Sequence, residues 1–382
     1  MDSPPRPPAL AVGERELGRR AVLRAGLAAL AGLGGVGLLA GCGIDVRDLR
    51  WDPSLGAVRP EPAPTPGPDE LARRRAVASA RTLEALCSTA ARTWPQAAPV
   101  LTLVARQDAQ HLAALGAAAS QTSSSSPSAT GTGPGTPADL VAEHTAAATQ
   151  ALADTGTTSG PLARLLTQVG AARAVQARQV AAALGVAQPP DPKAPASRPR
   201  TPAPSASSAT PTAGSSSRAS SSGASSPGAA SVSASPSPDL RLRKQVLDAL
   251  TAALRGEQAA VYGYEALAVR LAGGARDQAT AAIGGHQDVA DLLGALLRRA
   301  GKEPPSPAPG YRLPGPVQTP EQATALAAEI ESSLAEADGD LVAATDGDGS
   351  EGEVRAVAVQ LVVQRALAAS AWGAPPTAFP GG

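Results

Sequence analysis

The chain has 382 residues, with 33 lysines and arginines against 33 aspartates and glutamates, so its formal net charge is zero. This balance gives no electrostatic basis for binding nucleic acid, and we expect no nucleic-acid partner. Three Trp, three Tyr and one Phe stand among abundant alanine, and no segment shows convincing strand alternation. The composition therefore favours closely packed helices over a β-sandwich or a barrel.

The N-terminal segment, residues 1–41, has the pattern of an export signal. A twin-arginine pair, Arg19-Arg20, precedes an apolar stretch from Ala25 to Ala40, and Leu39-Ala40-Gly41-Cys42 resembles a bacterial lipobox. The apolar stretch has sixteen residues and contains five glycines. A retained membrane helix is the weaker alternative, because a spanning helix needs about 18 or more apolar residues.

The lipobox predicts that Cys42 carries a diacylglycerol and an amide-linked acyl chain. Two or more chains give stable anchoring, so we expect an exported protein held on the outer face of the cytoplasmic membrane. The other cysteine, Cys87, would then have no partner for an intramolecular disulfide, and we expect it to be a small buried residue in a helix.

Two blocks with helical periodicity follow a proline-rich tether, residues 42–68. We expect four helices in the first block, residues 69–186, with a Ser/Thr/Gly/Pro loop at 120–137; the helices are 69–94, 99–119, 138–154 and 161–185. Residues 187–238 contain mostly Ser, Pro, Ala and Thr, which predicts a disordered linker, with O-glycosylation as an open alternative.

The second block, residues 239–382, again predicts four helices, with a crossover rich in proline and glycine at 301–319; the helices are 240–272, 276–300, 320–345 and 351–371. The blocks share short matches, Arg106-Gln107-Asp108 with His286-Gln287-Asp288 and Ala142-Glu143 with Ala328-Glu329. Helix pairs separated by a long middle crossover suit ferritin-like connectivity. We therefore expect an all-α chain of two tandem ferritin-like four-helix bundles joined by the disordered linker.

Polar residues interrupt the apolar stripes of the second block. At helical spacing Glu257 and His286 fall on the centre lines of their stripes, Glu331 falls at a border, and Arg365 points inward. A carboxylate and an imidazole on facing helices suit iron, manganese or zinc. However, Ile283 stands three residues before His286 and the fourth helix has no Glu-x-x-His, so we favour a Glu257–Arg365 ion pair over a di-iron centre.

The first block has a similar set. Asp108 lies at the centre of the second-helix stripe with His111 one turn later, His144 lies at the centre of the third helix, and Arg173 at the centre of the fourth. Hydrogen-bonded core histidines are the favoured interpretation of His111 and His144. A weak mononuclear metal site remains the alternative. The sequence shows no glycine-rich phosphate loop, no cysteine pair with metal spacing and no nucleophile elbow.

The second block resembles an uncharacterised ferritin-like domain of actinobacterial proteins. The resemblance rests on Glu257 with Ala259-Ala260-Val261-Tyr262-Gly263-Tyr264, then His286, Pro304-Pro305, Tyr311-Arg312-Leu313-Pro314, Glu331, Trp372-Gly373 and Phe379-Pro380-Gly381. It implies a four-helix ferritin-like bundle and carries no established activity. Ferritin-like proteins at large bind di-iron or di-manganese, and this chain departs from that pattern at Ile283, Arg365 and Gln258, where a histidine is usual.

We therefore expect a lipid-anchored envelope protein that acts as a binding or scaffold module, with no cofactor and no catalytic residues. Its partners would be the membrane, through the lipid on Cys42, and a protein of the envelope. The alternative is a metal-dependent oxidoreductase or a metal-storage protein that holds iron or manganese with Glu257, His286 and Glu331.

Overall fold

The computed structural model describes residues 65–116, 135–193, 240–347 and 349–382. The predicted signal, Cys42, nearly all of the tether, most of the serine-rich loop and nearly all of the linker lie outside these residues. Predictions about them remain predictions.

The helices of the N-terminal block, which we define as residues 65–193, are α1 (Pro68–Thr93), α2 (Ala98–Ala114), α3 (Pro137–Asp154) and α4 (Gly160–Leu184), with short 3-10 turns η2 (Pro95–Ala97) and η3 (Thr155–Thr157). Each α-helix has a proline in its first turn, where the missing N–H costs nothing. Thr136 and Asp139 form a reciprocal capping box at the start of α3. Gly185, with a φ of 67°, ends α4 in the left-handed conformation that glycine adopts most readily.

The helices of the C-terminal block, which we define as residues 240–382, are α5 (Lys244–Ala268), α6 (Gly273–Arg299), α7 (Pro320–Ala344) and α8 (Ser350–Ala371). Thr319 and Gln322 cap α7 reciprocally, and Pro320 occupies its first turn. α8 is the one described helix long and apolar enough to cross a membrane, and most of it is buried within the protein, as in a core helix.

The eight predicted helices are confirmed, and the described residues contain no strand. Two predicted ranges were too long. α2 ends at Ala114 with Leu115 as its C-cap, because Gly116 then takes a φ of 72°. α5 begins at Lys244 rather than at residue 240, and it ends at Ala268.

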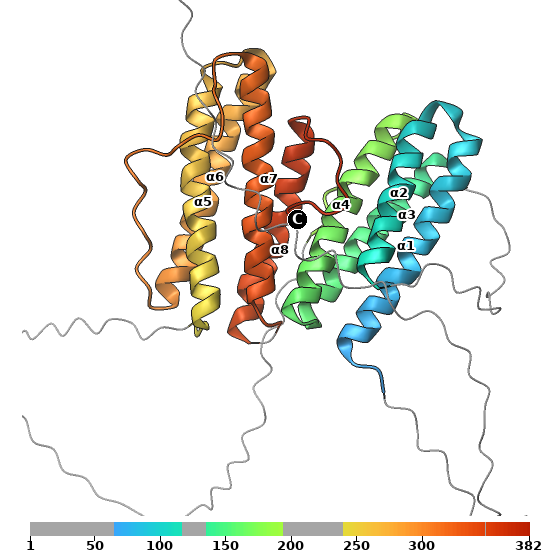
Figure 1. The fold of residues 1–382 in the computed structure, drawn as a ribbon, viewed down its shortest axis with the longest axis horizontal. Coiled ribbons are helices and arrows are strands. Elements are labelled where there is room, and N and C mark those ends of the chain that lie inside the picture. Colours follow the sequence, from blue (N-terminus) through green and yellow to red (C-terminus); the bar gives the residue numbers. More distant parts are fainter. Residues whose placement is uncertain (1–64, 117–134, 194–239, 348) are drawn as a thin grey trace, which may run out of the picture. The chain divides into compact units, whose positions relative to one another are not determined.

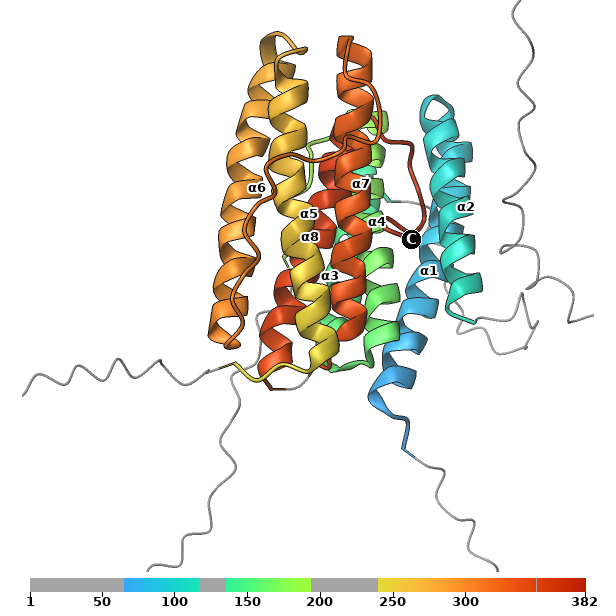
Figure 2. The ribbon, with the colours of Figure 1, turned by 60° about the vertical axis from the view of Figure 1, so that its left-hand side comes forward.

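Within each block the helices pair in chain order. α1 packs on α2, α3 on α4, α5 on α6 and α7 on α8, while α5 also lies against α7. Figures 1 and 2 show α5 to α8 running side by side, with the segment between α6 and α7 following the length of these helices. This arrangement brings one central polar position from each helix into the interior of its block.

The two blocks share a core. All eight helices belong to one compact unit, Pro64–Gly382, and α4 packs against both α7 and α8. One apolar cluster accordingly contains Ala171 and Val175 of α4 together with Val359 and Val363 of α8. α8 is therefore buried on two sides, against its own bundle and against α4.

Candidate functional site

Four helices of the C-terminal block each bring a charged or ionisable side chain to its centre. They are Glu257 of α5, His286 of α6, Glu331 of α7 and Arg365 of α8, all buried, and we call them, with Tyr264 and Asp338, the C-terminal polar centre. The structure thus brings together all three predicted metal ligands and the predicted arginine. The prediction that Glu331 lies at the border of its stripe was wrong, since that side chain is 2 % exposed.

Arg365 joins the two glutamates. Its Nη2 donates to Glu257 Oε1 at 2.7 Å, and its Nη1 donates to Glu331 Oε2 at 3.4 Å. Burial opposes the charge on the guanidinium, but Glu257, Glu331 and Asp338 outweigh that effect and raise the pKa of Arg365. The guanidinium is thus a buried side-chain cation in contact with both glutamates.

His286 lies between the same two carboxylates. Its Nδ1 is 2.7 Å from Glu257 Oε2, whereas its Nε2 is 3.3 Å from Glu331 Oε1 without the alignment of a hydrogen bond. Burial works to lower the pKa of His286, but the two glutamates more than offset it and the pKa is raised. Burial likewise works to raise the pKa of Glu331, while His286 and Arg365 bring it below its usual value.

Tyr264 and Asp338 complete the centre, and the sequence did not single them out as polar residues of a site. The Tyr264 hydroxyl donates to Glu331 Oε1 at 2.6 Å, and its ring stacks obliquely against His286 with centroids 4.9 Å apart. Burial and the nearby carboxylate raise the pKa of Tyr264, so the phenol keeps its proton. Asp338 is seven residues after Glu331, a spacing of two helical turns that places both on one face.

Asp338, like His286 and Arg365, has a buried polar atom without a hydrogen-bond partner among the described residues. It is 1 % exposed, and its Oδ2 has no hydrogen-bond partner in the described structure. Burial, aided by repulsion from Glu257, raises the pKa of Asp338 well above its usual value. The raised pKa of Asp338 favours its uncharged form, while Arg365 and His286, whose pKa values are also raised, lie against Glu257 and Glu331.

This pairing bears on metal binding. No group of three or more His, Cys, Asp or Glu side chains in the described ranges is arranged to hold a metal ion. The carboxylate oxygens of Glu257 and Glu331 are instead directed at Arg365, His286 and Tyr264. As folded, these residues do not fit a metal, because the guanidinium takes the position from which both carboxylates are neutralised.

The N-terminal block has a corresponding centre, with Cys87 from α1, Asp108 from α2, His144 from α3 and Arg173 from α4, all buried. We call these four the N-terminal polar centre. Arg173 Nε lies 4.0 Å from Asp108 Oδ1, a longer contact than the 2.7 Å between Arg365 and Glu257. Arg173 of α4 and Arg365 of α8 therefore each belong to the polar centre of their block, but Arg173 lies farther from its carboxylate than Arg365 does.

Cys87 belongs to this polar centre as well as to the apolar core. Its Sγ lies 3.3 Å from His144 Nε2, a contact that was not predicted from the sequence. Burial raises the pKa of Cys87 to about 12 and lowers that of His144 to about 4, so the pair is a neutral thiol beside a neutral imidazole. This pair lacks the thiolate that a cysteine nucleophile or metal ligand requires.

Several polar atoms of the N-terminal polar centre have no hydrogen-bond partner among the described residues. They are Asp108 Oδ2, His144 Nδ1 and two nitrogens of Arg173, Nε and Nη2. Burial lowers the pKa of Arg173, and Asp108 opposes that effect. The N-terminal polar centre is therefore less completely paired than the C-terminal one.

His111 contacts the end of the chain. Its Nδ1 lies 3.3 Å from Asp108 Oδ1, and its Nε2 lies 2.8 Å from the carbonyl oxygen of Ala378. A carbonyl only accepts, so Nε2 carries the proton of that bond. The ring also meets Phe379 edge-on, with centroids 5.4 Å apart. The predicted core histidine thus connects α2 with residues 374–382, which we call the C-terminal tail.

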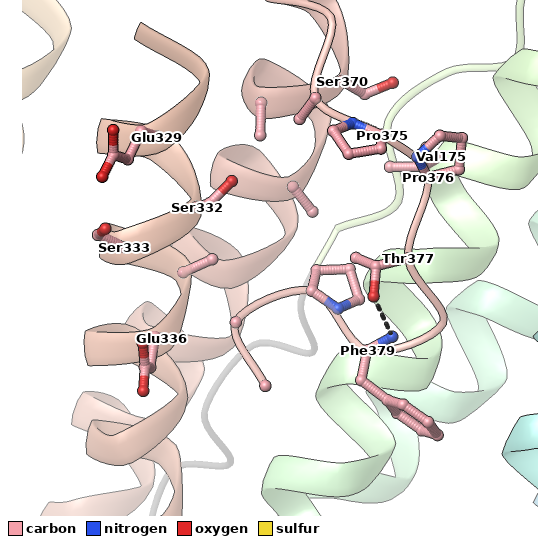
Figure 3. Close-up of a pocket in the computed structure, with 17 residues that line it drawn as sticks. Val175, Glu329, Ser332, Ser333, Glu336, Ser370, Pro375, Pro376, Thr377 and Phe379 are labelled. Carbon is pink, nitrogen blue, oxygen red and sulfur yellow. Dashed lines mark hydrogen bonds between the residues drawn. The ribbon is translucent and has the colours of Figure 1, made fainter. Parts of the chain in front are cut away.

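A cavity of about 380 Å³ lies beside the tail, bounded by α7, α8 and Val175 of α4. Figure 3 shows Glu329, Ser332 and Glu336 of α7 on one side and the tail opposite, where the Phe379 amide donates to the hydroxyl of Thr377. No residue of either polar centre lines this cavity. The cavity and the buried charges are therefore separate features.

Residues 249–382 match the family model of a domain of unknown function (DUF4439). A solved structure of a conserved hypothetical protein from Mycobacterium tuberculosis is 26 % identical, with a TM-score of 0.32, over 34 % of this chain and 97 % of that chain. No curated protein matches the chain. The predicted resemblance of the second block to a family without a known function is thereby confirmed for residues 249–382.

Proposed function

We propose that the protein is a non-catalytic lipoprotein of the cell envelope, in which two tandem ferritin-like four-helix bundles serve as a binding or scaffold module. The long crossover between α6 and α7 supports the ferritin-like assignment of the C-terminal block. The resemblance of residues 1–42 to a twin-arginine signal with a lipobox cysteine supports a position on the outer face of the cytoplasmic membrane, and the composition of residues 187–238 supports a disordered linker.

The observation that carries the non-catalytic part is the contact of Arg365 with Glu257 and Glu331. A fixed side-chain cation supplies the charge that a metal ion would otherwise supply to these carboxylates. A buried carboxylate cannot easily lose such a partner, because breaking a buried ion pair costs about 3–5 kcal/mol. The centre is thus a structural element of the bundle in this proposal.

Metal analysis of the chain without residues 1–42, purified after growth with iron, manganese and zinc, tests this proposal. We expect no stoichiometric metal in the wild type. Arg365→Met removes the cation and leaves Glu257, His286 and Glu331 facing one another, so we expect about one equivalent of divalent metal and a less stable apo-protein. Arg298→Met, at an exposed position of α6, is the matched control and should behave as the wild type.

Two results would count against parts of this proposal. About two metal ions per bundle in the wild type, together with oxidase or peroxidase turnover, would refute the non-catalytic function. Metal in neither protein would show that the guanidinium does not substitute for a metal ion.

The second candidate is a metal-dependent oxidoreductase or metal-storage protein, and the meeting of Glu257, His286 and Glu331 from three helices favours it. Iron or manganese would be the metal. Loss of bound metal in His286→Ala, with the helical circular dichroism unchanged, would support this candidate over the first.

Anchoring has its own test. Cys42→Ala removes the atom to which the lipid would be attached, so we expect the protein to move from the detergent phase to the aqueous phase on detergent partitioning. Cys87→Ala is the control and should stay in the detergent phase. Unchanged retention of Cys42→Ala would refute the lipobox interpretation.

A further inference from the structure

The N-terminal and C-terminal blocks meet through a well-formed interface. α4 lies against α7 and α8, and the shared apolar cluster includes Leu152 and Ala163 from one block and Leu341 and Val342 from the other. If the blocks were apart, these buried side chains would face water. Apolar burial contributes about 25 cal/mol per Å², so the interface has a driving force of its own.

Backbone segments of the two blocks also approach closely at two glycines. A Cβ atom at Gly160 would overlap the carbonyl oxygen of Ala343, and one at Gly347 would overlap that of Gly156. Only the lack of a side chain allows this proximity. The surfaces are therefore complementary at the level of the backbone.

Arg355 of α8 makes polar contacts across the same interface. Its guanidinium is buried, and Nη1 donates to the carbonyl oxygens of Thr155 and Thr158 at 2.9 and 2.6 Å. Its Nε donates to Thr345 Oγ1 at 3.0 Å within the C-terminal block. The Arg355 side chain thus donates hydrogen bonds to backbone carbonyl groups of the segment between α3 and α4.

The C-terminal tail adds a second set of contacts. Arg164 and Gln168 of α4 donate to the carbonyl oxygen of Gly381 at 3.2 and 3.1 Å, and His111 lies against Ala378 and Phe379. Arg164 also pairs with Asp340 of α7 at 2.7 Å. Apolar, polar and charged contacts therefore all connect the same two blocks.

We propose that the N-terminal block is a binding partner for the C-terminal block, so that the two remain associated when the chain between Lys193 and Leu240 is cut. The N-terminal block would hold the C-terminal block without a covalent connection. This inference depends on the interface alone and stands whether or not Cys42 is lipidated.

Site-specific cleavage of the whole folded chain tests the proposal. A protease recognition sequence is placed between Ala209 and Ser215, the purified protein is cut to completion at micromolar concentration, and the mass is measured by light scattering after gel filtration. We expect one peak containing one N-terminal and one C-terminal fragment. Separate peaks for the two fragments would overturn the proposal, as would a complex containing two copies of each fragment.

Variants identify the surface responsible. Gly160→Leu places a side chain where Ala343 now approaches, so its cut fragments should separate. Gly284→Leu is the matched control, because a Cβ there meets no atom within 4 Å, and its fragments should stay together. Arg355→Met serves as a second interface variant if Gly160→Leu does not fold, and its complex should dissociate at least tenfold more readily on dilution. Variant complexes as tight as the wild type would contradict the assignment of this surface.

Discussion

At the scale of single residues, the C-terminal polar centre shows how buried carboxylates can be paired by side chains alone. Arg365 and His286 face Glu257 and Glu331, and the raised pKa of Asp338 favours its uncharged form. Each cation touches at least one carboxylate, which offsets the desolvation of both. Side chains paired in this way are compatible with a bundle whose interior stays closed.

Asp338 makes the stability of the protein depend on pH. Its pKa is raised in the folded state, so above about pH 4 the unfolded chain releases a proton that the folded chain retains. The free energy of unfolding therefore falls as the pH rises from about 4 towards the folded pKa. Asp338→Asn should raise the melting temperature at pH 7 and flatten its decline with pH, as measured by circular dichroism.

Asp288→Asn is the control for this prediction, because Asp288 is exposed on α6 and its substitution should leave the profile unchanged. A lower melting temperature for Asp338→Asn at pH 7 would show that the carboxyl group donates a bond that the structure depends on.

At the scale of helices, glycine sets the distance between α3 and α4. A Cβ atom at Gly170 would lie 2.7 Å from Leu152 Cδ2 and 3.3 Å from the carbonyl oxygen of Ala148. Gly170→Ala should therefore lower the free energy of unfolding by about 1–3 kcal/mol, because overpacking a core forces its neighbours to move. Gly284→Ala, on the exposed face of α6, should raise it by about 0.5–1 kcal/mol, as alanine favours a helix. Denaturant unfolding measures both, and equal effects would refute the proposed spacing role.

The helices and the central polar residues could largely be predicted from the sequence. Capping residues, prolines and glycines fixed most helix ends within a few residues, and periodicity identified Glu257, His286 and Arg365 because each lies in the middle of an apolar stripe. Asp338 shares the buried face of Glu331, which the periodicity had placed at the border of its stripe. Arg355 was missed for a different physical reason. An apolar stripe assigned to one contact face of a helix does not predict that a residue on a second face of the same helix is also buried.

At the scale of the whole molecule, the association of the blocks follows from α4 and α8, which are buried around most of their circumference. A helix that is apolar all round belongs in a core rather than at a surface. The sequence of each block alone could not show this, because the second contact face becomes buried only against the other block. The interface is consequently the feature of the fold that the periodicity of the separate blocks does not predict.

The contact of His111 with Ala378 joins positions 267 residues apart. During synthesis the N-terminal block leaves the ribosome first, yet α2 obtains this partner only after Ala378 has been translated. Loop closure over such a separation is slow compared with local helix formation. A chain without Ala378 would keep all eight helices and still lack this contact, so this one connection between the two blocks forms after the other elements of the interface have been made.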